Sequence, residues 1–314
     1  LLSVLLVLVM VFSLAACGSG DNGGDAEGEV YNVGMICIGD ENAAYDRNFY
    51  MAADAAKEQL AAKGINIAWT YTYNHPEGDP VATDCRDLGD AGCIAVFCNS
   101  YGMEPAMLTV APEYPDTVFV GMTNENSWKD DLDNTVNTFP SVYEGRYLAG
   151  IAAGLKLNEM IAAGQFKAEE AKIGYVGAYP YAEVISGYTS FFLGARSVCP
   201  TATMDVKFTG SWYDEGKEKE AAEALIKGGC KLISQHADSM GAPTACEVAK
   251  VPNVSYNGST AEACPNTFIV SSRIDWTPYM TYMINCVKEG KTIDADWCKG
   301  LEEGAVKLTE LGTA

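Results

Sequence analysis

The sequence predicts an α/β fold of two lobes, each built on a doubly wound parallel sheet, with several strands forming the hinge between them. Three observations support this prediction. From residue 30 onward, short apolar runs alternate with amphipathic stretches, a pattern typical of βαβ crossovers. The two halves of the chain open with similar segments, and 314 residues exceed what one hydrophobic core usually supports.

Apolar runs in the first half predict the strands of the first lobe. They begin at Val33 (VGMICI), Ile65 (INIAWTY), Cys93 (CIAVFC) and Val118 (VFVGM). Between the first two runs, residues 46–62 space their apolar side chains at helical intervals and end near Gly64, which suits the position after a helix. The first lobe therefore begins with a strand, a helix and a second strand.

The second half repeats this organisation after a predicted helix over residues 141–160. Its predicted strands begin at Ile173, Met204, Leu232 and Val254, with helices over 183–196, 215–227 and 243–250. The run IGYVG leads through AYPYAEVIS into a helix, as VGMICIG leads through DENAAYDRN in the first half. The second lobe is therefore expected to have the architecture of the first.

The last part of the chain predicts further crossings between the lobes. Residues 267–290 contain a strand-like run, FIVSSR, and a helix, WTPYMTYMINCVKEG. We expect lobe 1 to comprise residues 30–140 and about 271–292, and lobe 2 to comprise residues 141–270 and about 293–314. Several crossings of this kind form a hinge.

The first residues have the features of an export signal. Residues 1–16 are uncharged and apolar over the length of a signal peptide, and they end in Leu-Ala-Ala before Cys17, a motif similar to the lipobox of bacterial lipoproteins. We expect Cys17 to be lipidated, the alternative being a cysteine that happens to follow an ordinary signal peptide. Residues 17–29 are rich in glycine and acids and predict a flexible tether. Two acyl chains suffice to anchor the protein stably at the outer face of the cell membrane.

The charge balance restricts the possible ligands. The chain has 21 Lys and Arg against 42 Asp and Glu, giving a net charge of −21. Such a field repels phosphate backbones, so we expect no nucleic-acid partner. Highly anionic ligands are disfavoured for the same reason, which leaves neutral or cationic solutes.

Cysteines leave two interpretations open. Of the 11 cysteines, ten remain once Cys17 is assigned to lipid, an even number that permits disulfides outside the cytoplasm. Proximity in sequence favours Cys85 with Cys93 and Cys286 with Cys298; the alternative is buried free thiols. Their spacing is not that of a zinc site, and we expect neither a metal nor a cofactor.

The carboxyl ends of the predicted strands are the expected ligand site, as in open parallel sheets generally. These ends fall at residues 39–48, 99–101, 123–126, 178–183, 211–214, 236–239 and 257–259. They are rich in aromatic rings and hydrogen-bonding groups, a mixture that suits a flat heterocycle.

Individual residues within these ends have candidate roles. Trp212 and Tyr45 are candidates for ring stacking on the ligand, with packing as the alternative for both, and Tyr179 is a further candidate ligand residue. Trp276 opens a predicted helix and either lines the hinge side of the cleft or packs at the hinge. Glu183 and Arg146 are expected to make contacts between elements and not to bind the ligand.

An enzymatic function has weak support in the sequence. A GxSxG nucleophile elbow is absent, and His75 and His236 are the chain's two histidines. His236 stands next to Asp238 and Ser239 at a strand end, but three residues so close in sequence rarely form a catalytic triad. A contact with the ligand or a hydrogen bond that orients the lobe is the expected role of His236.

Several segments together resemble the basic membrane protein (BMP) family of solute-binding lipoproteins. These are VGMICIGDENAAYDRNF, CIAVFCNSYG, YEGRYLAGIAAGLKL, IGYVGAYPYAEVISGYTSFFLGARSVCP, SWYDEGKEKEAAEALIKGGC and ISQHADS. The resemblance covers about residues 30–312. It implies a type I periplasmic-binding-protein fold and a role in delivering solute to the permease of an ABC importer. We expect the protein to act as a monomer. The ligand is expected to be a small neutral heterocycle, a nucleoside or purine base.

The resemblance also implies site residues. The first-lobe ligand loop contains Asp40, Asn42, Tyr45 and Asn48; Ser100 and Tyr101 match the next loop; Trp212 resembles the stacking position; and Asp238 and Asn257 resemble groups that bind the base edge. The chain departs from the pattern at Ala43 and Ala44, where nucleoside-binding members have an Asn-Asp pair followed by Phe-Asn. A sugar or signalling molecule is therefore an alternative ligand. An extracytoplasmic hydrolase using His236 and Asp238, or a surface antigen or sensory subunit, is an alternative function.

Overall fold

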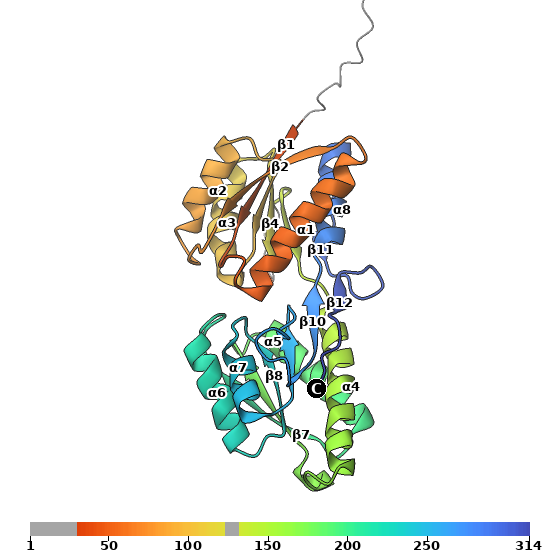
Figure 1. Cartoon of the computed structure of the whole chain (residues 1–314). Helices are drawn as coiled ribbons and strands as arrows, with labels where there is room; N and C mark the ends of the chain where they lie inside the picture. The colour runs from red at the N-terminus through yellow and green to blue at the C-terminus, as the bar shows by residue number, and fades with distance from the viewer. Residues whose placement is uncertain (1–29, 123–131) are drawn as a thin grey trace, which may run out of the picture.

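The structure, a computed structural model, describes residues 30–122 and 132–314 and consists of two α/β lobes, drawn one above the other in Figure 1. The predicted signal peptide, Cys17, the tether and the strand-end segment 123–126 lie outside the described residues. Within the described part of the chain, no helix is long and apolar enough to cross a membrane.

The first lobe contains a six-stranded sheet in the order β11-β5-β4-β3-β1-β2, and all its strand pairs are parallel. Its strands are β1 (Val30–Ile36), β2 (Asn66–Thr72), β3 (Ala95–Cys98), β4 (Val118–Met122), β5 (Thr135–Thr138) and β11 (Asp296–Trp297). Its helices are α1 (Ala44–Ala61), α2 (Val81–Asp90), α3 (Glu104–Val110) and α8 (Thr277–Glu289), with short 3-10 turns at Tyr101–Met103 and Ala111–Glu113.

Helices cover both faces of this sheet, which is why its inner strands β3 and β4 are apolar and almost fully buried. Along β1, Val33 and Met35 pack with α1 and α8, whereas Ile36 faces α2 and α3. Figure 1 shows α1 and α8 on one side of the upper sheet, with α2 and α3 on the other. Gly34 lies under α2, where an added Cβ would come within 2.6 Å of Leu88.

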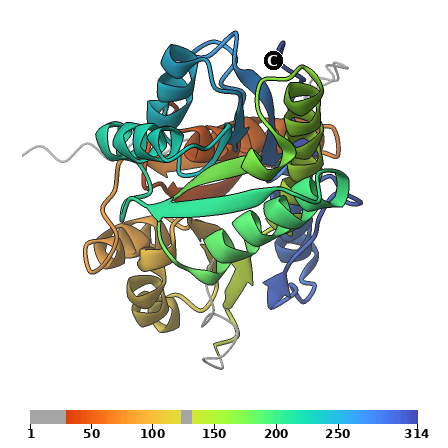
Figure 2. The ribbon, with the colours of Figure 1, turned by 90° about the horizontal axis from the view of Figure 1, so that it is seen from below.

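The second lobe has a six-stranded sheet in the order β12-β10-β9-β8-β6-β7. Its strands are β6 (Lys172–Gly177), β7 (Thr203–Phe208), β8 (Leu232–His236), β9 (Asn253–Tyr256), β10 (Phe268–Ile274) and β12 (Val306–Leu308). Its helices are α4 (Val142–Ala162), α5 (Ala182–Val198), α6 (Glu215–Lys227) and α7 (Gly241–Ala249), with a 3-10 turn at Ala168–Glu170. In Figure 2 these helices surround the strands of the lobe.

The second sheet differs from the prediction at one edge, because β12 runs antiparallel to β10. The other described pairs of this sheet are parallel. The helices α4 and α5 share one core with β6, while α6 and α7 form a second core on the opposite face. The doubly wound prediction therefore holds for the strands that carry the cleft loops.

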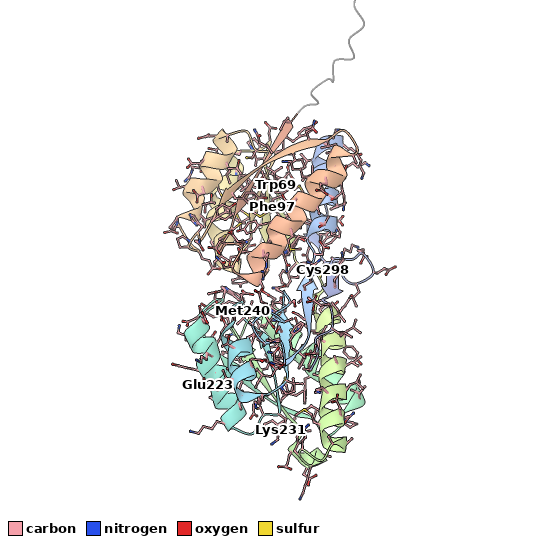
Figure 3. The ribbon with its side chains drawn as sticks, in the orientation of Figure 1. Trp69, Phe97, Glu223, Lys231, Met240 and Cys298 are labelled. Carbon is pink, nitrogen blue, oxygen red and sulfur yellow. The ribbon has the colours of Figure 1, made fainter. Side chains whose placement is uncertain are left out.

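The chain passes between the lobes at residues 139–141, 275–276 and 298–305. All of β10 pairs within the second sheet, so residues 271–274 belong there and not to lobe 1 as expected. Conversely, β11 pairs with β5 in the first sheet, so the return to lobe 1 extends beyond residue 292. Figure 3 shows Cys298 at this passage, between the two lobes.

The ten described cysteines are free thiols, and all except Cys298 are buried. The sulfur of Cys85 lies 3.8 Å from that of Cys98, across the α2–β3 interface, and not against Cys93. Cys298 is exposed, with Ser141 Oγ 3.4 Å from its sulfur. The disulfides expected from proximity in sequence are therefore absent from the structure, and the free-thiol alternative describes these residues.

Candidate ligand-binding site

The carboxyl ends of the two sheets face each other across a cleft between the lobes. A narrow cavity, which we call the enclosed cavity because side chains of both lobes surround it, lies there. It is lined by Ile38, Tyr45, Asn99, Ser100 and Tyr101 from lobe 1 and by Glu183, Trp212, His236, Asp238 and Tyr256 from lobe 2. In Figure 3, Met240 marks the face of the lower lobe at this junction.

A wider part of the cleft, about 490 Å³, continues outward from the enclosed cavity and shares three of its residues: Ile38, Trp212 and Asp238. It is further lined by Gly39, Asp40, Asn42, Ala43, Asp46, Asn74, Glu77, Tyr179, Ser211 and Tyr213. Of the predicted ligand residues, Asp40, Asn42, Tyr45, Ser100, Tyr101, Tyr179, Trp212 and Asp238 line one or both parts.

Asp46 ties the first-lobe loops together beneath the cleft. Its Oδ1 accepts hydrogen bonds from the backbone N of Gly39 (3.1 Å) and from Nδ2 of Asn99 (2.7 Å). The Oδ1 of Asn99 in turn accepts from the backbone N of Ile38 (2.9 Å). Burial raises the pKa of Asp46 to about 6, although the hydrogen bonds from Asn99 and Gly39 act to lower this pKa. The loops after β1 and β3 are thereby fixed in one arrangement.

Tyr45 and Asp40 occupy different depths of the first-lobe loop. The hydroxyl of Tyr45 donates to the carbonyl of Asn99 (2.7 Å), which places its ring in the enclosed cavity. Asp40 is at the outer mouth, where it accepts hydrogen bonds from the backbone N of Asn42 (2.9 Å) and from Nδ2 of Asn74 (3.1 Å). These bonds lower the pKa of Asp40, so it is a carboxylate at neutral pH.

Glu77 connects the loop after β2 to the loop after β3. Its Oε1 accepts from the hydroxyl of Ser100 (2.6 Å) and from the backbone N of Gly102 (2.7 Å). A Cβ on Gly102 would lie 2.7 Å from the carboxyl carbon of Glu77, so a glycine is required for this approach. The Ser100 hydroxyl lines the cavity but is already engaged by a carboxylate.

Aromatic rings from both lobes meet at the mouth of the enclosed cavity. Tyr101 stacks on Tyr181 with ring centroids 4.9 Å apart, and this pair joins the lobes. Tyr181 also stacks on Tyr179 (5.1 Å), whose ring meets Trp212 edge to face (5.1 Å). Tyr101, Tyr181, Tyr179 and Trp212 therefore form one continuous aromatic cluster, whereas the ring of Tyr45 packs edge to face on Phe49.

His236 is paired with Glu183 at the floor of the cavity. Its Nε2 lies 3.0 Å from Oε1 of Glu183, and its ring lies 4.0 Å from the ring of Tyr256. Burial lowers the pKa of His236 although Glu183 acts in the opposite direction, so the imidazole is neutral at pH 7. The imidazole therefore has Glu183 as its partner, and not Asp238 as the hydrolase alternative requires. Glu183 makes the expected contact between elements and also lines the cavity.

Asp238 projects from the loop between β8 and α7. Its backbone N donates to the carbonyl of Trp212 (3.0 Å), and burial raises the pKa of its carboxyl well above the usual range, as do the nearby carboxyls of Glu218, Asp46 and Glu183. Glu218 holds this loop, because its Oε1 accepts from the backbone N of Ser239 (3.2 Å). Burial also raises the pKa of Glu218 to about 7.

Arg146 makes the expected contacts between elements behind the cavity. It is fully buried and donates to Oγ of Ser234 (2.6 Å), to the hydroxyl of Tyr175 (3.1 Å) and to the carbonyl of Ser255 (3.0 Å). Its guanidinium carbon lies 5.6 Å from the centroid of the Tyr256 ring. Arg146 thus anchors α4 to three strands of the second sheet.

Three predicted ligand residues lie away from the cavity linings. Nδ2 of Asn48 donates to the carbonyl of Asn257 (2.8 Å), a hydrogen bond that joins the lobes. Asn257 has a positive φ of 60°, which turns the chain after β9. Trp276 is fully buried in the core of lobe 1, stacked on Phe49 at 4.5 Å, so the structure favours its packing role at the hinge.

Cavity residues that sequence reasoning left out share one signal, their position at a strand end. Ile38, Asn99 and Tyr256 directly follow or end β1, β3 and β9, and Ser211 and Tyr213 flank Trp212. Asn74 and Glu77 follow β2, whose carboxyl end was not among the expected segments.

Comparison with known proteins gives a family match over almost the whole described chain. A family model described as ABC transporter substrate-binding protein PnrA-like (Bmp) matches residues 33–313. A Haloferax volcanii protein named as an ABC transporter glucose-binding protein is 32% identical over 294 residues, which cover 93% of this chain and 70% of that protein. A purine-binding protein of Brucella abortus is 31% identical over 281 residues, covering 89% of this chain and 75% of that protein.

The solved structures confirm the predicted fold. An ABC transporter solute-binding protein from Aeropyrum pernix superposes with a TM-score of 0.74 at 19% identity, covering 89% of this chain and 76% of that chain. At this identity the likeness concerns the fold, which is the two-lobed type I fold of periplasmic solute-binding proteins.

Proposed function

The chain belongs to the Bmp family of ABC transporter substrate-binding proteins, and on this premise we propose that it captures a nucleoside or purine base between its lobes for an ABC importer. The observation that carries the proposal is the enclosed cavity to which both lobes contribute aromatic rings and polar groups. Such rings stack on a flat heterocycle, while the carboxyl of Asp238 is suited to bind its edge. The purine-binding relative supports this choice of ligand.

Capture requires the two lobes to move relative to each other. The cavity is enclosed by side chains from both lobes, so a solute enters when they separate and is covered when they close. A ligand drives this change by binding the closed state more tightly than the open one. The three chain passages between the lobes are the structural basis for a hinge.

Binding without chemical conversion is part of the proposal. His236, the candidate base, has its Nε2 engaged by Glu183, and its Nδ1 is buried without a hydrogen-bond partner among the described residues. In the described part of the chain, neither ring nitrogen is hydrogen-bonded to a serine, threonine or cysteine that could serve as a nucleophile. Turnover of a bound nucleoside to base and ribose would contradict this part of the proposal.

We place the protein outside the cytoplasm, held by a lipid on Cys17 and acting as a monomer beside its permease. The support is the apolar run before Cys17, the glycine-rich tether that follows, and the membership of a substrate-binding family. Metabolic labelling with a fatty acid, lost in Cys17→Ala, tests the anchor.

A sugar is the second candidate ligand, favoured by the name of the Haloferax volcanii relative. The cleft is compatible with it because carboxylates, amides and aromatic rings also bind sugar hydroxyls and ring faces. Ala43 and Ala44, which depart from the loop of nucleoside-binding members, are consistent with this candidate as well.

A thermal-shift screen of the purified protein against nucleosides, nucleobases and sugars separates the two candidates. A ligand at 100 times its Kd, binding the native state alone, stabilises by about 2.7 kcal/mol and raises the Tm. We expect purine compounds to raise it. Stabilisation by sugars with no response to any purine or pyrimidine would replace the nucleoside proposal with the sugar candidate. Mass spectrometry of small molecules released on denaturation gives an independent identification.

A further inference from the structure

The two parts of the cleft are lined by several acidic side chains and by no lysine or arginine among the described residues. The acidic lining residues come from both lobes: Asp40, Asp46, Glu77, Glu183 and Asp238. A concave site lined by one sign of charge concentrates the field inside it and attracts the opposite charge.

Nearby basic groups do not cancel this field inside the cavity. The Arg146 guanidinium lies behind the Tyr256 ring and is held there by Ser234, Tyr175 and the carbonyl of Ser255. His236 is paired with Glu183 and buried. The carboxylates that face the solute therefore lack a cationic partner in the described part of the protein.

Aromatic rings line the same enclosed cavity. Two of these rings come from lobe 1, Tyr45 from the first turn of α1 and Tyr101 from the 3-10 turn after β3, and two from lobe 2, Trp212 from the loop after β7 and Tyr256 from the end of β9. A cation near the face of such a ring is attracted by the ring's quadrupole, and more strongly where water is excluded. Rings and carboxylates around one small cavity are a chemical environment that favours organic cations.

Tyr256 adds an independent sign of a missing polar partner. It is 3% exposed and lines the cavity, yet its hydroxyl has no hydrogen-bond partner among the described residues. A buried hydroxyl without a partner is costly, so a ligand group is expected to supply the bond. The Tyr256 oxygen can accept a hydrogen bond from a cationic N–H.

We propose that the solute bound in this cleft carries a positive charge on its ring system, as an N-methylated or protonated purine nucleoside or base does. The inference rests on the proposed function for the ring system and adds the charge. Around a neutral purine the carboxyl of Asp238 keeps its proton, because burial and the neighbouring carboxyls raise its pKa well above the usual range. A cation in the cavity instead favours the ionised carboxylate and gains contacts with the rings.

Isomeric methylated nucleosides test the charge separately from size and shape. At pH 6, 1-methyladenosine and 7-methylguanosine are cations, whereas their isomers N6-methyladenosine and 1-methylguanosine have the same heavy atoms and are neutral. Calorimetric titration of the purified protein with each compound gives four dissociation constants. We expect the cationic isomer of at least one pair to bind at least tenfold more tightly than its neutral isomer.

A variant pair tests whether the cleft carboxylate causes the preference. Asp238→Asn is expected to reduce the cationic-to-neutral affinity ratio at least fivefold. Asp116→Asn makes the same change in net charge at an exposed position that precedes β4, at the sheet edge opposite the cleft, and is expected to leave the ratio unchanged. An unchanged ratio in Asp238→Asn, in a protein that still binds the neutral isomer, would contradict the role of this carboxylate.

The possible failures are distinguishable. Equal or tighter binding of the neutral isomers in both pairs overturns the charge inference and leaves the nucleoside proposal in place. Absence of binding by all four nucleosides and by their parent bases overturns the proposed function. In that case nicotinamide and its permanently cationic 1-methyl derivative test the charge alone: preference for the cation supports the inference, and equal binding or no binding rejects it.

Discussion

At the scale of single residues, Trp212 is the side chain on which the proposed function depends most directly. It lines both parts of the cleft, and the described contacts of its ring are with the neighbouring rings of Tyr179 and Tyr181. Stacking of an aromatic ring on a base contributes about 1–3 kcal/mol, so Trp212→Ala should weaken binding of a purine ligand about tenfold to a hundredfold.

Calorimetry on Trp212→Ala should be paired with its Tm, since a folding defect would also lower affinity. Leu193→Ala, at an exposed position on α5, is the matched control for losing a large exposed side chain. Both variants should retain a Tm close to that of the parent protein, and the control should keep its affinity. Unchanged affinity in Trp212→Ala would show that the ring packs against its neighbours and not against the ligand.

Glu218 makes a pH-dependent contribution to stability. Burial raises its carboxyl pKa from 4.5 to about 7, so between these values the folded chain retains a proton that the unfolded chain has released. Below pH 4.5 the carboxyl is protonated in both the folded and the unfolded chain, so its burial does not lower the free energy of unfolding. That free energy falls as the pH rises from 4.5 through 7. The full effect corresponds to at most about 3 kcal/mol.

Urea unfolding at pH 5 and pH 8 tests this sign. Glu218→Gln lacks the titration, so the stability of the parent protein relative to this variant should fall between the two pH values. Glu220→Gln, on the exposed side of α6, should show a difference that does not change with pH. A stability of the parent, relative to Glu218→Gln, that rises with pH would mean that hydrogen bonds to the carboxylate outweigh its burial.

The sequence indicates which side chains line the cleft where position in the fold decides which way they point. A strand end in a parallel sheet faces the cleft, which was enough to place Tyr45, Trp212 and Asp238 in its lining. For Trp276 the sequence left cleft and core open, because the choice depends on where Phe49 of another helix lies. The pairing of His236 with Glu183 likewise depends on the distance between two loops and leaves no pattern in the sequence.

At the scale of elements, the packing of α4 on α5 depends on glycines. An added Cβ at Gly150 would lie 2.0 Å from the carbonyl oxygen of Phe191, a backbone atom that cannot rotate away. Gly150→Ala should therefore separate the helices and lower the free energy of unfolding by about 1–3 kcal/mol or more. Gly216→Ala, in the exposed first turn of α6, should be neutral or slightly stabilising.

The free energies of unfolding of both glycine variants can be obtained from urea titrations. A Gly150→Ala protein as stable as the parent would show that α4 and α5 can move apart without cost. Loss of stability in Gly216→Ala of the same size would show instead that any alanine in these helices is harmful, and the close approach would not be the cause.

Most elements could be predicted because their length and apolar pattern identify them, but the short ones could not. Residues 296–297 form β11 and residues 306–308 form β12, and runs of two or three residues have no detectable period. Their pairing is set by the neighbouring strand of a completed sheet. The lobe boundaries near residues 271 and 293 shifted for this reason, since these short strands decide where the chain changes lobe.

At the scale of the whole molecule, two kinds of contact hold the lobes together across the cleft. One is the hydrogen bond from Asn48 to the carbonyl of Asn257, and the other is the stack of Tyr101 on Tyr181. Tyr181 is absent from the linings of both parts of the cleft, so we expect it to stabilise the closed arrangement of the lobes without contacting the solute. The division into two similar lobes was predictable from the repeated strand-helix pattern, whereas these contacts were not.

Tyr181→Ala should weaken ligand binding by destabilising the closed arrangement. An aromatic pair contributes about 0.5–1.5 kcal/mol, and a smaller closed population raises the apparent Kd in proportion, so we expect a loss of about twofold to tenfold. The change should occur mainly in the dissociation rate, because the stack forms after the solute has entered. Stopped-flow kinetics measures the association and dissociation rates, and small-angle scattering of the ligand-bound protein measures how closed it is on average. We expect a more expanded average shape in the variant.

Tyr143→Ala, at an exposed position in the first turn of α4, is the control. A slower association rate with an unchanged dissociation rate would mean instead that Tyr181 guides the solute into the cleft.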